Sequence, residues 1–316
     1  MGGLKRRVLK FGGTSVGTPP ALRSALAIAE AAARERPIVV VVSALSGVTD
    51  ALEAALAGAA AGRLDISAFA AAVGARHLSL LAAVAQGKPA VRASTLVRER
   101  LGGLEARLRS VAAGASFSAA TRAAVLAVGE RACTPIVEAA LRARGIEAHA
   151  LDGASLLRTD EAFAEAAVDR AATRRLARTA VESLGPHAVP VVTGFVAGTE
   201  SGETTLLGRG GSDLTAAVLG WALEAERVEI WSDVDGMMTA DPRVDRGARR
   251  FERLSYAEAT ALARAGAKVL HPRTLEPLEG AGIPVFVGNT LRPGGPGTWI
   301  GPGETGQEAE EAGTAA

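Results

Sequence analysis

The chain has 316 residues, with 35 lysine and arginine residues against 34 aspartate and glutamate residues, which gives a formal net charge of +1. This balance does not support a nucleic-acid or membrane-surface partner, because either would need a basic excess on one face. A single cysteine, Cys133, excludes an intrachain disulfide, and four scattered histidines do not form a zinc-site pattern. The segment behind the basic N-terminus is too short for a signal peptide, and the longest apolar run, around Ile38 to Val42, is far short of a membrane span. We therefore expect a cytoplasmic protein.

Short β-branched runs alternate with long stretches rich in alanine, leucine, arginine and glutamate. Several runs are apolar on both alternations, as strands covered on both faces would be. The predicted strands are Arg7–Phe11, Ile38–Ser43, Ala148–Leu151, Val189–Phe195, Arg227–Ser232 and Ile283–Gly288. The predicted helices lie at about 20–35, 47–60, 65–86, 90–112, 118–144, 168–184, 212–225, 255–265 and 272–281. This rhythm predicts an α/β fold with a mainly parallel sheet and helices on both sides.

Two regions depart from this alternation. The stretch from about 47 to 144 is almost continuously helical, which predicts an all-α insertion between two strand-rich parts. From Gly301 onward the chain turns to glycine, glutamate, threonine and alanine, with almost nothing apolar. Such a composition predicts a disordered tail, so we expect the folded part to end near Ile300.

The first predicted strand runs into a glycine-rich turn. Lys10 is followed by Gly12 and Gly13, and then by hydroxyl residues that lead toward a helix. Ligands in open α/β sheets bind beyond the carboxyl ends of the strands, where glycines let backbone N–H groups approach a phosphate and a lysine adds a point charge. The spacing fits neither a Walker loop nor a dinucleotide-binding loop. The segment is therefore either a phosphate-binding loop or only a turn.

A second glycine-rich segment, Gly208–Asp213, precedes an apolar helix. Ser212 or Asp213 can cap this helix, but a cap does not require the preceding Gly-Arg-Gly-Gly. Glycines, a guanidinium and a helix N-terminus together favour an anion site, and Arg209 suits a bidentate carboxylate or phosphate.

The remaining candidates are ambiguous by themselves. The loop after Ser232 contains three aspartates and Arg243, which fits either turn chemistry or the orientation of a nucleotide and its metal. Lys268 would ordinarily be a surface residue, and His271, which precedes a proline, would ordinarily be a structural turn residue. Glu130 lies within a long helical stretch, and by itself it would ordinarily be an exposed surface residue.

In this order and spacing, these segments resemble aspartate kinases of the amino-acid kinase family, from about residue 6 to residue 300. The matching segments are Lys10–Ser15, Val42–Asp50, Gly208–Asp213, Asp233–Arg243 and Gly266–Pro272, with Val285–Val287 and Gly297–Thr298 at the end. The resemblance implies the amino-acid kinase fold, a three-layer αβα sandwich with a mainly parallel sheet. It implies one catalytic domain over residues 1–300, with an N-terminal amino-acid lobe to about residue 200, a C-terminal nucleotide lobe over about 201–300, and a tail over 301–316.

The resemblance also implies ATP-dependent phosphorylation of the side-chain carboxylate of L-aspartate to 4-phospho-L-aspartate, the first step toward lysine, threonine and methionine. Mg²⁺ would be carried by ATP rather than by a metal site of the protein. Glu130 would pair with the α-ammonium group of aspartate and Arg209 with its carboxylate. The implied catalytic residues are Lys10 and Asp213, with the backbone amides of Gly12 and Gly13. The implied aspartate-binding residues are Ser43, Thr49, Glu130, Arg209, Gly210, Gly211 and Ser212. The implied nucleotide-binding residues are Lys10, Ser232, Asp233, Met238, Arg243, Lys268 and Val269.

The chain departs from the family in three places. Met238 stands where the family usually has an aromatic residue near the nucleotide, and Leu206 where threonine is common, so we expect altered affinity more than lost activity. Aspartate kinases usually continue into ACT regulatory domains, whereas about sixteen residues follow Ile300 here. The chain is either naturally short or trimmed, and we expect no feedback by lysine or threonine through such domains.

Many dimer contacts of the family involve ACT domains, and a homodimer is one assembly that the resemblance allows. Two other functions stay open. One is a related kinase that phosphorylates another amino acid or carboxylate in a specialised pathway. The other is a non-catalytic regulator that binds a nucleotide or an amino acid on the same fold.

Overall fold

The computed structural model describes residues 4–114, 117–239, 245, 247–265 and 270–303. Its centre is an eight-stranded sheet with the strand order β3-β4-β2-β1-β7-β9-β10-β8, in which only the β9–β10 pairing is antiparallel. A two-stranded hairpin, β5–β6, is separate from it. The strands are β1 (Arg7–Phe11), β2 (Ile38–Val42), β3 (Ala148–Leu151), β4 (Val189–Thr193), β5 (Val196–Gly198), β6 (Thr204–Leu206), β7 (Arg227–Ser232), β8 (Arg253–Leu254), β9 (Val285–Asn289) and β10 (Thr298–Ile300).

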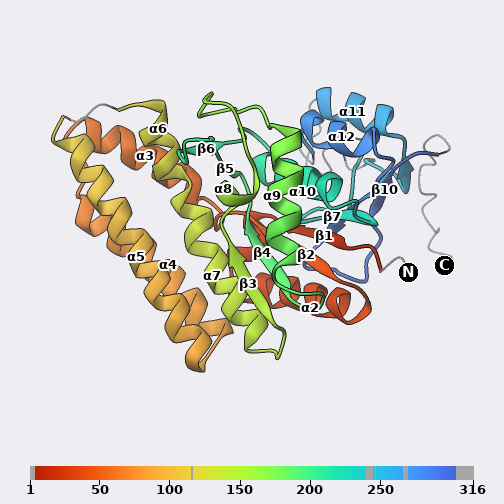
Figure 1. The fold of residues 1–316 in the computed structure, drawn as a ribbon, viewed down its shortest axis with the longest axis horizontal. Coiled ribbons are helices and arrows are strands. Elements are labelled where there is room, and N and C mark those ends of the chain that lie inside the picture. Colours follow the sequence, from red (N-terminus) through yellow and green to blue (C-terminus); the bar gives the residue numbers. More distant parts are fainter. Residues whose placement is uncertain (1–3, 115–116, 240–244, 246, 266–269, 304–316) are drawn as a thin grey trace.

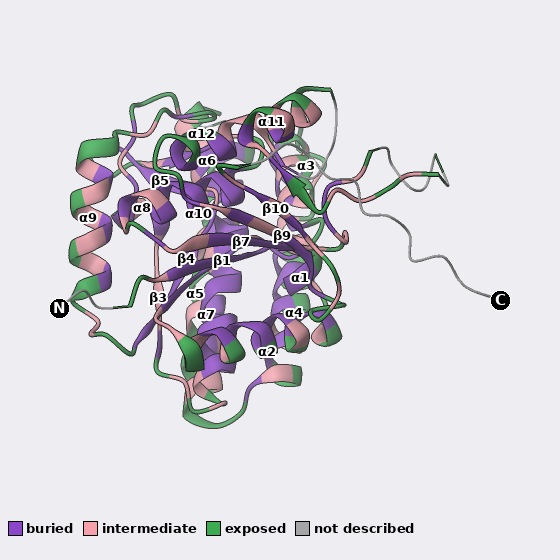
Figure 2. Cartoon of the chain, turned by 90° about the vertical axis from the view of Figure 1, so that its right-hand side faces the viewer, coloured by how far each residue is buried: buried purple, intermediate pink, exposed green. Residues whose placement is uncertain are grey.

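Helices cover both faces of the sheet, which confirms the predicted three-layer αβα sandwich (Figure 2). On one face α10 packs against β1, β2 and β7, with α9 and α12 beside it; on the other, α2 and α7 pack against the sheet. The helices are α1 (Gly13–Val16), α2 (Pro19–Glu35), α3 (Val48–Ala60), α4 (Ile66–Val84), α5 (Gly87–Ala112), α6 (Ala119–Leu126), α7 (Val128–Arg142), α8 (Gly153–Leu156), α9 (Arg170–Glu182), α10 (Gly211–Ala222), α11 (Tyr256–Arg264) and α12 (Pro272–Glu279).

The central strands are buried as their sequence predicts. All five residues of β1, β2 and β4 are buried, including the unbroken valine run of β2, because helices lie on both sides. Several predicted boundaries were wrong. The strand predicted over 189–195 ends at Thr193, where the chain turns into β5; the helix predicted over 118–144 is divided at Ala127; and the last predicted strand begins at Val285.

One continuous sheet contains strands from both of the predicted lobes, because β1 pairs with β2 on one side and with β7 on the other. The predicted division near residue 200 therefore does not coincide with a break in the sheet. From residue 304 onward the predicted tail lies outside the described residues.

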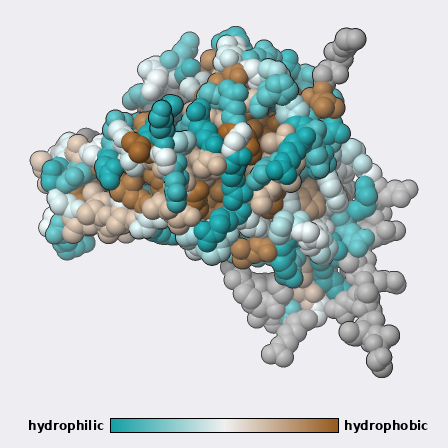
Figure 3. All heavy atoms as spheres, turned by 90° about the horizontal axis from the view of Figure 1, so that it is seen from below, coloured by the Kyte–Doolittle hydropathy of each residue, from teal (hydrophilic) through white to brown (hydrophobic). Residues whose placement is uncertain are grey.

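The predicted all-α insertion is present as α3 to α7. Its two long helices, α4 and α5, lie side by side at one side of the molecule (Figure 1). Among the described helices, only α4 is long and apolar enough to cross a membrane by length and composition. A single helix of this kind is weak evidence for a span, and α4 packs against α5 and α7. Seen from below, the surface mixes hydrophilic side chains with smaller apolar areas (Figure 3).

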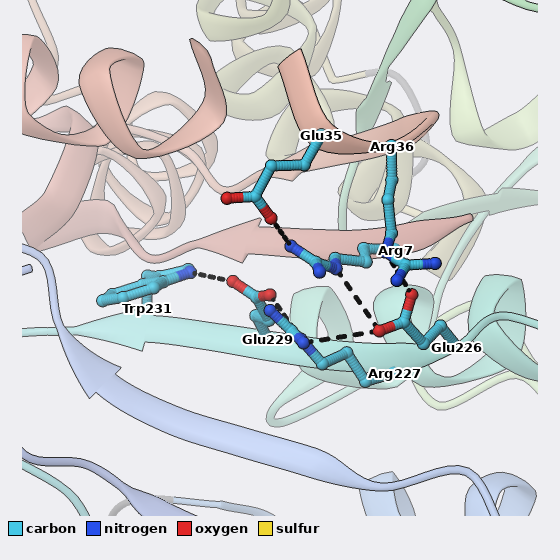
Figure 4. A network of polar contacts seen from close by, with 7 residues as sticks. All are labelled: Arg7, Glu35, Arg36, Glu226, Arg227, Glu229 and Trp231. Carbon is cyan, nitrogen blue, oxygen red and sulfur yellow. Dashed lines mark hydrogen bonds and ion pairs between the residues drawn. The ribbon is translucent and has the colours of Figure 1, made fainter. Parts of the chain in front are cut away.

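A network of ion pairs lies on one face of β1 and β7 (Figure 4). Glu229 is buried, and its carboxylate accepts hydrogen bonds from Arg227 Nε (2.7 Å) and Trp231 Nε1 (3.0 Å). Arg7 pairs with Glu35 at 2.9 Å, and Glu226 pairs with Arg36 at 2.9 Å. Each of these carboxylates has a guanidinium partner, so the charges on this face compensate one another.

Candidate active site

A pocket of about 360 Å³ lies beyond the carboxyl ends of β1 and β2, where open α/β sheets bind their ligands. Its volume is within the range of small-molecule sites. No histidine or cysteine is among the described residues that line it. These residues are Lys10, Gly13, Ser43, Ala44, Leu45, Ser46, Gly47, Thr49, Asp50, Glu130, Phe195, Gly208, Gly210, Gly211, Ser212 and Asp213.

The pocket lining contains an ion pair between the sheet and a helix. Lys10, near the end of β1, places its Nζ 2.6 Å from Oδ1 of Asp213 in the first turn of α10. Both residues are buried, with exposed fractions of 8% and 9%. At such depth the pair is held in one geometry, so the ammonium group is fixed where it can meet an anionic ligand.

Two helix N-termini also contribute to the pocket. The N-cap residues are Gly47 for α3 and Gly210 for α10, and both have positive φ, at 76° and 68°. Neither has a side chain that could cap its helix. The first N–H of each helix donates to the preceding loop, from Val48 to Leu45 and from Gly211 to Gly208, and the N–H groups that follow in the first turn are left for other acceptors. Helix N-termini carry partial positive charge, and together with Lys10 they favour an anionic group in this pocket.

Glu130 supplies a carboxyl group of unusual character. It lies in the first turn of α7, is 3% exposed, and its Oε2 has no hydrogen-bond partner among the described residues. Burial raises the pKa of Glu130 to about 8, although hydrogen bonds to the backbone of Ala44 and of Glu130 itself, and the charge of Arg131, lower it. A buried carboxylate with an unpaired oxygen beside a pocket is suited to a cationic ligand group.

Gly13 lies so close to the loop after β2 that a side chain at this position would not fit. A Cβ atom there would lie 2.9 Å from the carbonyl oxygen of Ala44 and 3.2 Å from the backbone nitrogen of Ser46. These atoms belong to the loop after β2, which lines the pocket. The glycine therefore lets the loops after β1 and β2 pack together.

We expect Gly13→Ala to lower the free energy of unfolding by about 1–3 kcal/mol, because the added methyl group meets backbone that cannot move aside freely. The control is Gly102→Ala in the middle of α5, where a Cβ would meet nothing within 4 Å. That variant should be more stable than wild type by about 0.5–1 kcal/mol. Urea unfolding measures both, and equal stability of the two variants would contradict this account.

Most of the predicted amino-acid-site residues come together in the structure. Ser43, Thr49, Glu130, Gly210, Gly211 and Ser212 all line the pocket with Lys10, Gly13 and Asp213. Arg209 is exposed and is not among the lining residues. Gly12 does not line the pocket either, and its N–H donates to the carbonyl oxygen of Trp231 at 3.1 Å. The roles of Arg209 and Gly12 stay predictions.

Apart from Lys10 on β1, the predicted nucleotide-site residues begin at Ser232 in β7, which adjoins β1. Ser232 ends β7 and donates a hydrogen bond from Oγ to Oδ1 of Asp233 at 3.1 Å. The backbone of Met238 pairs with that of Arg250 in a single antiparallel β-bridge outside the strands. Arg243, Lys268 and Val269 lie outside the described residues.

Several residues that line the pocket had no role predicted from the sequence. Ser46, Gly47 and Asp50 belong to the loop and helix start after β2, and they lie within the matching segment Val42–Asp50, in which only Ser43 and Thr49 were given a role. Phe195 gave none. It was predicted to lie within a strand, but it has a φ of 66° and lines the pocket.

The comparisons with known proteins agree with this architecture. The chain is 36% identical over 299 residues to lysine-sensitive aspartokinase 3 of Escherichia coli, covering 93% of this chain and 63% of that protein. It is 33% identical over 298 residues to the chloroplastic aspartokinase 2 of Arabidopsis thaliana, covering 93% of this chain and 54% of that protein. The chain thus spans less than two thirds of the length of these relatives.

Among solved structures, E. coli aspartokinase III in complex with aspartate and ADP superposes with a TM-score of 0.85 at 33% identity, over 97% of this chain and 66% of that one. The family model described as "Amino acid kinase family" matches residues 5–289, which include every described residue of the pocket. From this match, and from a sheet and pocket built as described above, we conclude that the chain belongs to the amino acid kinase family.

Proposed function

We propose that this chain phosphorylates the side-chain carboxylate of L-aspartate with ATP, giving 4-phospho-L-aspartate and ADP, in the biosynthesis of amino acids. The observation that carries the proposal is one pocket with a fixed ammonium group, Lys10, and an unpaired buried carboxyl group, Glu130. A zwitterionic amino acid with a second carboxylate offers a partner for each. The similarity to aspartokinases, one of them solved with aspartate and ADP, supports the same substrates.

The chemistry needs little from the protein beyond positioning. A carboxylate is already ionised at neutral pH, so one of its oxygens can attack the γ-phosphorus without a general base. A bond forms between that oxygen and phosphorus while the bond from phosphorus to the bridging oxygen of ADP breaks. Lys10 would neutralise charge on the moving phosphoryl group, and Asp213 would hold the Lys10 ammonium in place.

Glu130 would receive the α-ammonium group of aspartate. We propose that Mg²⁺ enters with the nucleotide, because Mg²⁺ prefers phosphate oxygens with one or two carboxylates. Asp213 and Asp50 are among the residues that line the pocket, and a carboxyl group is a donor of that kind. Mg²⁺ supplies charge neutralisation at the phosphates, and the residues of this chain orient the two substrates.

The test is to incubate the purified chain with Mg-ATP, L-aspartate and hydroxylamine. Hydroxylamine traps acyl phosphates, so we expect aspartyl hydroxamate together with ADP in equal amounts. If the chain binds ATP but forms neither product, aspartate is the wrong substrate. A screen of other amino acids with the same trap then separates a related kinase from a non-catalytic binding protein.

The pKa of Glu130 predicts a pH dependence for aspartate binding. Because this pKa is about 8 in the free protein, the carboxyl group is mostly protonated at pH 6 to 7 and must lose its proton to pair with an ammonium group. We therefore expect the Kd for aspartate to fall by up to about tenfold for each pH unit between 6 and 8 and to level off above 8. The other ionisable groups that line the pocket are Lys10, Asp50 and Asp213, and Arg131 follows Glu130 in α7.

Calorimetric titration in buffers with different ionisation enthalpies measures this effect directly. At pH 6.5 binding should release close to one proton, and at pH 9 almost none. A Kd that is the same from pH 6 to 8, with no proton release, would contradict the role given to Glu130.

A further inference from the structure

The chain leaves β4 through a tight turn at Phe195. The N–H of Val196 donates to the carbonyl oxygen of Gly194 at 2.6 Å, and φ of Phe195 is 66°. A hydrogen bond between residues two apart around a positive φ defines the rare and strained form of the γ-turn. An aromatic residue adopts such a φ only where its surroundings force it to. Since Phe195 lines the pocket, this strain lies at the candidate site.

Two glycines let the turn press against the start of α10. A Cβ at Gly194 would lie 2.7 Å from both Cβ and Oγ of Ser212. A Cβ at Gly211 would lie 2.6 Å from Cδ2 of Phe195. The strained turn and the first turn of α10 are therefore in direct contact, and that turn of α10 also contains Asp213.

One side chain links these two elements by hydrogen bonds. Thr215 is completely buried and does not line the pocket. Its Oγ1 accepts a hydrogen bond from the N–H of Phe195 at 3.0 Å and donates one to the carbonyl oxygen of Gly211 at 2.9 Å. A hydroxyl group is needed for this arrangement, because it accepts from one backbone group and donates to another.

We propose that Thr215 is a positioning residue for the amino-acid pocket: its hydroxyl holds Phe195 in the strained turn and so fixes the ring as a wall of the pocket beside Gly211 and Ser212. This inference rests on the proposed function for the identity of the ligand, L-aspartate. Without the hydroxyl, the N–H of Phe195 loses its partner in a buried setting, and the turn is free to relax toward a negative φ. The aromatic wall then moves, and the first turn of α10 loses its link to it.

The decisive comparison uses three variants. Thr215→Val keeps the shape of the side chain and removes the hydroxyl. Thr215→Ser keeps the hydroxyl and removes the methyl group. The matched control is Thr173→Val in α9, because Thr173 is also completely buried and its Oγ1 accepts from the N–H of Arg158 at 3.0 Å, but it does not line or adjoin the pocket.

We expect Thr215→Val to raise the KM for aspartate about tenfold while the KM for ATP stays within about twofold of wild type, since a lost partner for a buried donor corresponds to a change of this order. Thr215→Ser should restore the KM for aspartate to within about threefold of wild type. Thr173→Val should lower the free energy of unfolding by about as much as Thr215→Val does, but it should change neither the KM for aspartate nor the KM for ATP. An unchanged KM for aspartate in Thr215→Val, or an equal rise in Thr173→Val, would overturn the proposal.

A second readout does not depend on the substrate. Hydrogen–deuterium exchange of peptides that cover Gly194–Val196 should be faster in Thr215→Val than in wild type, Thr215→Ser and Thr173→Val. If wild type forms no aspartyl hydroxamate, the proposed function fails, and this exchange still decides whether Thr215 holds the turn. Exchange that is the same in all four proteins would overturn the positioning role even if the chain phosphorylates aspartate.

Discussion

Replacing Lys10 by alanine should lower kcat for aspartate phosphorylation by about 10²- to 10³-fold, with the KM for ATP changed by no more than about threefold. Lys10 is the only lysine or arginine among the described lining residues, and its ammonium group is held 2.6 Å from Asp213. As the bond to ADP breaks, negative charge shifts toward the bridging oxygen of ADP, so the loss of a fixed positive charge beside the reacting phosphate affects the transition state more than the bound nucleotide. ADP release, coupled to a pyruvate kinase assay, measures both constants.

The control for this prediction is Lys88→Ala. Lys88 is exposed near the start of α5 and does not line the active-site pocket. This variant should keep wild-type kinetics. Because Lys10→Ala leaves Asp213 buried without its partner, thermal unfolding must show that the variant is folded at the assay temperature. A folded Lys10→Ala variant whose kcat stays within a few-fold of wild type would refute the role of Lys10.

Glu130→Gln should raise the KM for aspartate about 30-fold or more, because it removes one partner of a buried charge pair while keeping the shape of the side chain. The matched control is Glu138→Gln on the same helix. Glu138 is also buried, but it pairs with Arg142 at 3.2 Å and does not line the active-site pocket. The control should lose stability and keep the KM for aspartate. Equal KM values for aspartate in Glu130→Gln and wild type would contradict the proposal that Glu130 binds aspartate.

The same variant should be more stable than wild type at neutral pH. The pKa of Glu130 is about 8 in the folded chain, against an ordinary value of 4.5 for a glutamate carboxyl group. The folded state therefore holds a proton that the unfolded state has lost, and the stability of wild type falls as the pH rises from about 4.5 to 8. Glutamine has no such proton, so the free energy of unfolding of Glu130→Gln should rise relative to that of wild type over this pH range. The difference should reach about 3 kcal/mol at pH 7. Urea unfolding at pH 5, 7 and 8.5 checks both the sign and the window.

If Glu130→Gln is more stable than wild type but binds aspartate more weakly, then Glu130 serves ligand binding although it lowers the stability of the fold. Bound aspartate should reverse the effect in wild type, because an ammonium partner lowers the pKa of Glu130. We therefore expect aspartate to stabilise wild type and to have little effect on Glu130→Gln at the same concentration.

The sequence predicted six of the eight strands of the central sheet, because their signal is local. β1, β3 and β7 have the predicted bounds, since each is a β-branched or apolar run between helical stretches. The short strands β5, β6, β8 and β10 were not predicted, because two or three residues are too few to show a period. Their pairing depends on partners far away in the chain, such as Val287 opposite Thr298 and Arg253 opposite Trp299.

The chemistry of the site was only partly readable from its residues. The glycine-rich segments after β1 and before α10 indicated anion sites by composition, and the pocket contains Lys10, Gly13, Gly211 and Asp213. Glu130 carried no local signal, because a glutamate in a helix is ordinarily exposed. Only the resemblance to a family assigned it to the site, and only the fold buries it.

The sequence by itself determined the αβα layering and the glycine-rich loops, because periodicity and turn residues act over a few neighbours. The tertiary structure decided which distant groups meet and in what electrostatic setting. It placed Lys10 against Asp213 across 203 residues and buried Glu130 so that its pKa rises. It also held Phe195 in a strained turn through Thr215. Burial, desolvation and strain are properties of packed neighbours, so no local pattern in this chain could have specified them.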